Sequence, residues 1–188
     1  MNTSDIRKAL ANDPKASLYF IDVFSYDQMV RNVTGENDAL YVFNTKPSLL
    51  PGEHWMAMAV RDGEGFYFDS FGRHPAVYPA LSRKLQTLFR TIHWNKVAFQ
   101  NPSTTACGDY CILFGLLFSR GWTLQMFVNW LSSFTNSEIR DHTIRGIVID
   151  KYGTAFHSSY RDGRRGLSGF QQLHVDRIAK TVSGGCLF

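Results

Sequence analysis

The segment from Cys107 to Phe118 constrains the fold more than any other part of the chain. Polar, turn-forming residues at positions 100–106 lead into a cysteine, and residues 112–118 are then apolar apart from one glycine. This order predicts a hydrophobic helix that begins at Cys107. A thiol at the N-terminus of a helix lies at the positive end of the peptide dipoles, which favour the thiolate. The position therefore suits a nucleophile, with a buried structural cysteine as the alternative.

The size and composition of the chain predict one soluble globular domain that spans residues 1–188. A chain of 188 residues is long enough to bury a proper core. Hydrophobic residues make up 44% of it and charged residues 19%, which is ordinary for this class of protein. The 15 Phe, 8 Tyr and 4 Trp suit a dense core and an extended substrate groove.

The net charge indicates which partners the protein could bind, and the cysteine count indicates the redox state of its compartment. A net charge of +4 allows a polyanionic partner without requiring one, and the basic cluster at 161–165 is either a solvated loop or a nucleic-acid contact. Three cysteines exclude a dense disulfide framework and fit a reducing compartment. No apolar run approaches the roughly 18 residues of a membrane span, and the polar N-terminus does not resemble a signal peptide. We therefore expect a protein that is neither membrane-bound nor secreted.

Strand-like and helix-like segments together predict an α+β fold. Strands rich in β-branched and aromatic residues are expected at 18–24, 39–43, 55–60, 66–69 and 94–99. Helices are expected at 5–11 (with Ser4 as N-cap), 79–90, 107–119, 123–133, 137–152 and 171–182, and residues 26–33 form either a helical turn or a loop. Glycines predict a mobile loop at 153–169, and residues 183–188 are expected to form a flexible tail. The result is a small, mostly antiparallel sheet flanked by helices.

A predicted hairpin supplies a base for the cysteine. His54 stands at the start of one expected strand and Asp69 at the end of its partner. A five-residue turn at 61–65 is expected to join the strands, and its Asp-Gly pair at 62–63 is a strong hairpin signal. Pairing of the two strands would bring these two ends side by side. A carboxylate there can fix the tautomer of the imidazole and leave its other nitrogen for Cys107. An unremarkable histidine at a strand edge is the alternative.

Three further residues are candidates for catalysis or substrate binding. Gln100, at the end of an expected strand, can donate to an oxyanion together with the backbone N–H of Cys107. Trp55 can stack on the imidazolium of His54 as a cation–π partner, and Gly108 allows close approach of a substrate. Alternatively, Gln100 closes a surface turn, Trp55 belongs to the core and Gly108 only relieves crowding.

A zinc site is the rival chemistry for the same cysteine. Cys107 and Cys111, with His54 or His93, would supply ligands of the right kind. However, the chain has no CxxC pair and no HxxxH spacing, and one CxxxC is a weak signal. We therefore expect no metal site, and we assign Cys111 to the core.

These residues resemble the adenovirus-type cysteine proteases (adenain), a viral group related to the proteases of ubiquitin-like proteins. The likeness covers about residues 4–118, in order. It is carried by the segments Gly52–Met58, Tyr67–Gly72 and Gln100–Cys111, with weaker matches at Tyr19–Phe20 and Val42–Thr45.

The resemblance implies a fold, a catalytic role for each site residue, and a function in virus maturation. The fold would be that of adenain and the ubiquitin-like-protein proteases. His54 would be the general base, Asp69 its orienting acid, Cys107 the nucleophile and Gln100 an oxyanion donor. Substrate would be bound by Asn44, Trp55 and Gly108. Such enzymes cleave viral precursor proteins of the capsid and core during particle maturation, commonly at glycine-containing sites. We accordingly expect a monomer in the host cytoplasm or nucleus and in the virion.

Two departures from the family pattern affect these expectations. The acid is Asp69, whereas adenoviral enzymes carry Glu; Asp is usual in the ubiquitin-like-protein branch, so the chemistry survives. Adenoviral enzymes are stimulated by DNA and by a peptide that forms a disulfide upstream of the glutamine, but residues 91–96 contain no cysteine here. No cofactor is expected to be required, and stimulation by non-specific DNA or by a non-covalent peptide stays open.

The C-terminus and the reaction class leave alternatives open. Residues 182–185, Val-Ser-Gly-Gly, resemble the family's cleavage pattern, so the tail is either trimmed by the enzyme itself, an activating end in cis, or simply a flexible terminus. The rival functions are a protease that removes a ubiquitin-like modifier, an acyltransferase on the same fold, and a non-enzymatic scaffold.

Overall fold

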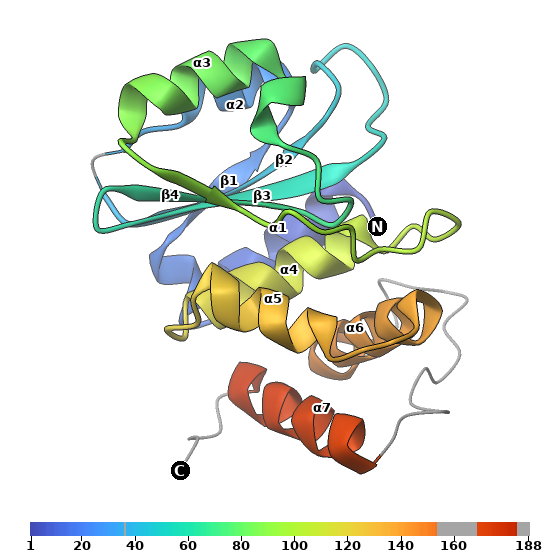
Figure 1. The fold of residues 1–188 in the computed structure, drawn as a ribbon. Helices are drawn as coiled ribbons and strands as arrows, with labels where there is room; N and C mark the ends of the chain where they lie inside the picture. The colour runs from blue at the N-terminus through green and yellow to red at the C-terminus, as the bar shows by residue number, and fades with distance from the viewer. Residues whose placement is uncertain (36, 154–168, 184–188) are drawn as a thin grey trace.

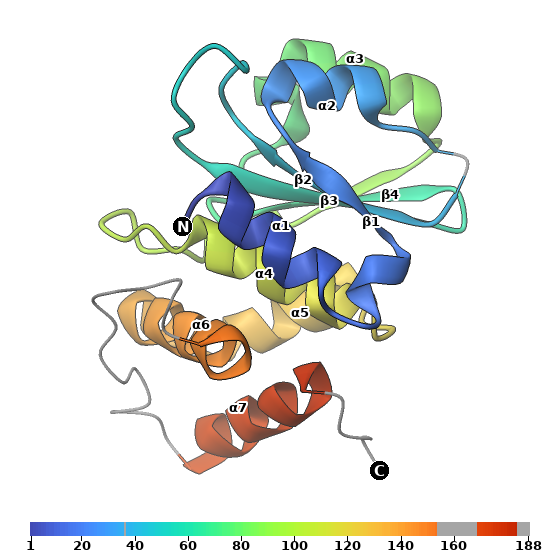
Figure 2. The same cartoon turned by 180° about the vertical axis from the view of Figure 1, so that it is seen from behind.

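The chain forms three layers, with one sheet between two groups of helices. This computed structural model describes residues 1–35, 37–153 and 169–183. Helices α2 (Tyr26–Asn32) and α3 (Pro79–Leu88) cover one face of the sheet, as Figure 1 shows. On the other face lie α1 (Thr3–Ala11), α4 (Cys107–Phe118), α5 (Leu124–Ser132) and α6 (Ser137–Tyr152), with α7 (Gly169–Val182) outermost (Figures 1 and 2). The α+β class is thus confirmed.

The sheet has five strands in the order in which they occur along the chain, and it is mixed. The strands are β1 (Phe20–Phe24), β2 (Ala39–Asn44), β3 (Trp55–Arg61), β4 (Glu64–Asp69) and β5 (Ile92–Trp94). The two central pairings, β2 with β3 and β3 with β4, are antiparallel, whereas both edge pairings are parallel. The sequence favoured a mostly antiparallel sheet. Since α2 connects β1 to β2 and α3 connects β4 to β5, each edge connection crosses over the sheet, which permits parallel neighbours.

The central hairpin turns tightly at Asp62 and Gly63. Both residues have positive φ angles, 52° and 74°, and the flanking pair is Arg61 opposite Glu64. A two-residue turn of this kind matches the twist of the strands and favours Asp-Gly. The turn is therefore shorter than the five residues expected from sequence, and it fixes the register that continues to Met56 opposite Asp69.

Helix α4 lies in the centre of the molecule, and all twelve of its residues are buried. It packs against β3 through the sheet face that carries Leu40, Ala57 and Phe68. At Gly115 an added Cβ would come within 2.6 Å of the Leu40 side chain, so the glycine lets helix and sheet approach closely. The opposite sheet face packs under α2 and α3 in a second apolar cluster. The predicted hydrophobic helix is confirmed.

The remaining expectations are mostly met, with two corrections. Helix α1 is capped by Asn2 instead of Ser4, because the Asn2 side chain accepts the Asp5 N–H while the Asp5 carboxylate accepts the Asn2 N–H. The last strand, expected at 94–99, is β5 at Ile92–Trp94, because Asn95 turns toward β4 instead of continuing the ladder. The predicted loop at 153–169, with its basic cluster at 161–165, and the predicted tail at 183–188 lie outside the described residues, apart from residues 153, 169 and 183. Within the described ranges no helix is both long and apolar enough to cross a membrane.

Candidate active site

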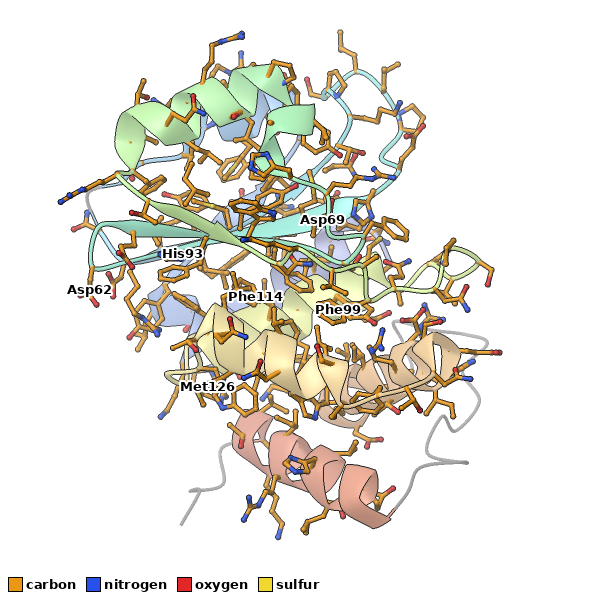
Figure 3. The ribbon with its side chains drawn as sticks, viewed as in Figure 1. Asp62, Asp69, His93, Phe99, Phe114 and Met126 are labelled. Carbon is orange, nitrogen blue, oxygen red and sulfur yellow. The ribbon has the colours of Figure 1, made fainter. Side chains whose placement is uncertain are left out.

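Four chemically reactive or polar side chains meet at one end of the sheet. His54 immediately precedes β3, Asp69 ends β4, Gln100 lies in the segment after β5, and Cys107 begins α4. In Figure 3 Asp69 and Phe99, the residue before Gln100, lie at the end of the sheet away from the Asp62 turn. All four side chains are buried: the exposed fraction is 8% for Cys107, 5% for His54, 4% for Gln100 and 0% for Asp69. The hairpin thus brings its two predicted site residues together.

The imidazole of His54 is fixed by Asp69. Its Nε2 lies 2.7 Å from Asp69 Oδ1, which also accepts the N–H of Phe71 at 2.8 Å. Asn95 holds the main chain of Asp69 from both sides, since it accepts the Asp69 N–H at 2.9 Å and donates to the Asp69 carbonyl at 2.6 Å. A carboxylate on Nε2 leaves Nδ1 as the nitrogen that faces the nucleophile.

The protonation state of His54 depends on Cys107 as well as on Asp69. Burial by itself would lower the pKa of His54, but hydrogen bonds to Asp69 and Cys107 and the negative charges of both groups raise this pKa to about 9. The imidazolium is therefore the favoured form at neutral pH. A cation beside a sulfur at a helix N-terminus is the environment in which a thiolate is stabilised.

The amide of Gln100 has a fixed orientation. Its Nε2 donates to the Thr104 carbonyl at 2.7 Å, and its Oε1 accepts the Ser70 hydroxyl at 2.7 Å. Because a carbonyl can only accept, the Thr104 contact decides which end of the amide is nitrogen. A primary amide carries two N–H groups, so one remains for another acceptor. This is the arrangement that an oxyanion donor requires.

The first turn of α4 provides the second source of donors. Its N-cap is Ala106, whose side chain offers no hydrogen bond to the first amides of the helix. Those amides point out of the helix N-terminus at the position of Cys107 and favour a negative charge. Gln100 and the start of α4 thus form two sides of a candidate oxyanion site.

A groove of about 450 Å³ lies where β2 ends and β3 begins, and its lining does not include any of the four site residues. Its lining includes Asn44, Trp55, Gly52, Lys46, Leu50 and Arg7. Asn44 Oδ1 accepts the N–H groups of Lys46 and Glu53, at 2.9 and 3.3 Å. Its Nδ2, although buried, has no hydrogen-bond partner among the described residues. A buried donor without a partner costs free energy, and this one is covered by Gly52, where an added Cβ would lie 2.4 Å from it.

For Trp55 and Gly108 the structure favours the alternatives that the sequence left open. The ring that packs on His54 is Phe71, with 4.7 Å between the ring centroids, and Trp55 instead packs against the main apolar cluster. The space beside Gly108 is filled, because an added Cβ would lie 2.7 Å from the sulfur of Met1. Gly108 therefore accommodates the N-terminal residue in this structure, and a substrate would have to displace it to approach there.

Phe71, Asn95 and Ser70 hold the site and were not predicted from the sequence. Ser70 and Phe71 directly follow Asp69, so their proximity could have been inferred from position alone. Asn95 lies 26 residues from Asp69 in sequence, and no local pattern indicates its contact.

The cysteines and acids of the described chain do not gather into a metal site. No group of three or more His, Cys, Asp or Glu residues in ranges 1–35, 37–153 and 169–183 could hold an ion. Cys107 and Cys111 are both free and buried. Burial and nearby negative groups raise the pKa of Cys111 well above its usual value, which leaves it an inert thiol.

Comparisons with known proteins do not assign this chain to a family. No protein-family model and no curated protein matches it. Among solved structures it is similar to a chain described as a deletion variant of AvrA with IP6 and CoA. The two share 14% identity and a TM-score of 0.43, over 94% of this chain and 83% of that one. Similarity at this level carries no argument about activity or ligands.

Proposed function

We propose that this protein is a cysteine endopeptidase of the adenovirus type. The observation that carries the proposal is the convergence of Cys107, His54, Asp69 and Gln100, each oriented by hydrogen bonds suited to its role. The 2.7 Å contact between His54 and Asp69 and the fixed amide of Gln100 support it most directly. The nucleophile of the proposal is the Cys107 thiol at the start of α4.

The reaction would proceed through a thioester. The Cys107 thiolate attacks the carbonyl carbon of the scissile bond, and the oxyanion accepts from Gln100 Nε2 and from the first amides of α4. As the intermediate collapses, the imidazolium of His54 gives its proton to the leaving amine. Water then attacks the thioester while neutral His54 takes its proton. The acid product leaves and the Cys107–His54 pair is restored.

The substrate would be an extended peptide that lies along the groove at the start of β3 and continues from there to His54 and Cys107. Asn44 and Trp55 both line this groove, and Trp55 offers an apolar wall. Resemblance to the adenovirus-type enzymes further suggests glycine-containing cleavage sites and capsid or core precursors as substrates. On the same basis we place the protein in the host cell and in the virion.

The decisive test is cleavage of a peptide library by the wild type and by Cys107→Ala, with and without DNA. We expect cleavage at glycine-containing sites by the wild type only, and loss of Gln100 should reduce turnover about 10²–10³-fold. Full peptidase activity in Cys107→Ala would refute the mechanism. Parallel reactions with SUMO- and ubiquitin-type probes and with acetyl-CoA and a lysine peptide would reveal a deconjugating protease or an acyltransferase. Absence of any labelling of Cys107 by an electrophilic peptide would favour a scaffold.

A further inference from the structure

Asp141 on α6 is a buried carboxylate that the proposed mechanism does not use. Only 3% of its surface is exposed. Its Oδ2 accepts the Asn101 N–H at 3.0 Å and the Thr104 hydroxyl at 2.5 Å. Its Oδ1 accepts the Tyr110 hydroxyl at 2.7 Å. Three donors from two distant segments thus converge on one carboxyl group.

The two oxygens of Asp141 hold the two sides of the candidate oxyanion site. Asn101 directly follows Gln100, and the Thr104 carbonyl is the acceptor that orients the Gln100 amide. Oδ2 therefore holds the ends of the short loop, residues 101–104, on which that amide rests. Tyr110 stands one turn after Cys107 in α4, so Oδ1 holds the nucleophile helix.

Helix α6 also holds the residue that precedes the glutamine. Arg140 donates to the carbonyl of Phe99 and to that of Phe134. Consecutive residues of α6 consequently bind the chain on both sides of Gln100. Placement of donors decides their contribution to a transition state, and a displacement of about 1 Å can cost about a hundredfold in rate.

We infer that Asp141 is a positioning residue for the oxyanion site, which sets the separation between the Gln100 amide and the first turn of α4. The inference rests on the proposed cysteine chemistry and deepens it. Asp141 does not touch the substrate. It acts through Thr104 and Asn101 on one side and through Tyr110 on the other.

Two probes of Cys107 separate positioning of the oxyanion site from general damage. Iodoacetamide alkylates the thiolate by displacement of iodide and forms no oxyanion. A peptide aldehyde, acetyl-Leu-Ala-Gly-glycinal, forms a tetrahedral adduct whose oxygen needs the oxyanion donors. Both are measured on the full chain by mass spectrometry and by competition between the two reagents. Asp141→Asn is compared with Thr143→Val, a matched change on the same helix, because the Thr143 hydroxyl donates to the Ile139 carbonyl of that helix.

We expect Asp141→Asn to weaken aldehyde binding about tenfold or more while iodoacetamide alkylation stays within about twofold. Thr143→Val should change neither. In a Gln100→Ala background Asp141→Asn should add little, because the donor that it positions is already gone. If Asp141→Asn fails to fold, Thr104→Val removes one donor of the same network and should show the same selective loss.

Three results would overturn the inference. The first is an equal loss of aldehyde binding and of iodoacetamide alkylation in Asp141→Asn. The second is a loss of aldehyde binding that adds fully to the loss in Gln100→Ala. The third is aldehyde binding that matches the wild type in both Asp141→Asn and Thr104→Val. If wild-type Cys107 reacts with neither probe, the proposed function falls and this inference falls with it. That outcome is distinct, because it is seen before any variant is made.

Discussion

Replacement of Asp69 by Asn tests whether the carboxylate sets the charge of His54. The hydrogen bond between them spans 2.7 Å and is fully buried. Hydrogen bonds to charged groups contribute about 1.5–3 kcal/mol, and about 1.4 kcal/mol corresponds to one pKa unit. The pKa of His54, raised to about 9 in the wild type, should therefore fall by about one to two units in Asp69→Asn.

The sign of the effect is defined by the direction of the wild-type shift. Because the pKa of His54 is raised in the folded state, its contribution to stability is fully present below the unfolded value of 6.5. This contribution is lost as the pH rises through about 9. In Asp69→Asn this loss should be complete at lower pH. At pH 8.5 the variant would hold a mostly neutral imidazole, which cannot protonate a leaving amine. The alkaline limb of turnover should move down in parallel.

The assay is NMR titration of the protein with ¹³C-labelled histidine rings. The chain has six histidines, and the signal of His54 is assigned from its loss in His54→Gln. Asp62→Asn is the matched control, since Asp62 sits in the hairpin turn at the other end of the same strands. A wild-type midpoint near 6.5, or a midpoint in Asp69→Asn within about half a unit of the wild type, would refute the argument.

Three further predictions concern stability and specificity of reaction. Burial opposes ionisation of Asp13, but hydrogen bonds from Arg120, Ala16 and Lys151 lower its pKa to about 2. In Asp13→Asn the free energy of unfolding, measured in urea at pH 7, should therefore fall by at least about 2 kcal/mol. The wild type should lose the same contribution to its free energy of unfolding as the pH falls from about 4 through about 2. Gly63→Ala should cost about 1 kcal/mol of stability in thermal unfolding, because φ is +74°, whereas an added Cβ would meet no other atom within 4 Å. The reactivity of Cys107 should stay unchanged. Cys111→Ala should cost about 1 kcal/mol and leave alkylation of Cys107 intact, and a fall in that alkylation would show that Cys111 is more than core.

The parts of the site that could be predicted from sequence depend on local rules. The Asp-Gly turn at 62–63 fixes the register of β3 and β4, so His54 and Asp69 had to lie at one end of the hairpin. The polar-to-apolar change at Cys107 likewise defines the start of α4. Each of these inferences requires only contacts within about fifteen residues of the chain, as for the His54–Asp69 pair.

The parts that could not be predicted depend on distant segments. Parallel pairing at both edges of the sheet follows from the path of α2 and α3 over one face, which no strand pattern encodes. The sequence predicts Asn95 within a strand, but its side chain forms hydrogen bonds with the main chain of Asp69, and β5 ends just before it. Asp141 is one acid on a helix, and its partner Thr104 lies 37 residues away.

Ser70 explains why these local and distant parts must move together. Its carbonyl accepts the N–H groups of Phe99 and Gln100, at 2.8 and 3.0 Å, while its hydroxyl donates to the Gln100 amide. Because Ser70 directly follows Asp69, a displacement of the end of β4 would shift the acid and the oxyanion donor at once. Helix α6 holds the other side of Gln100 through Asp141. The donor is thus fixed between the sheet and a helix far along the chain, so the placement of Gln100 depends on α6 as much as on the end of β4.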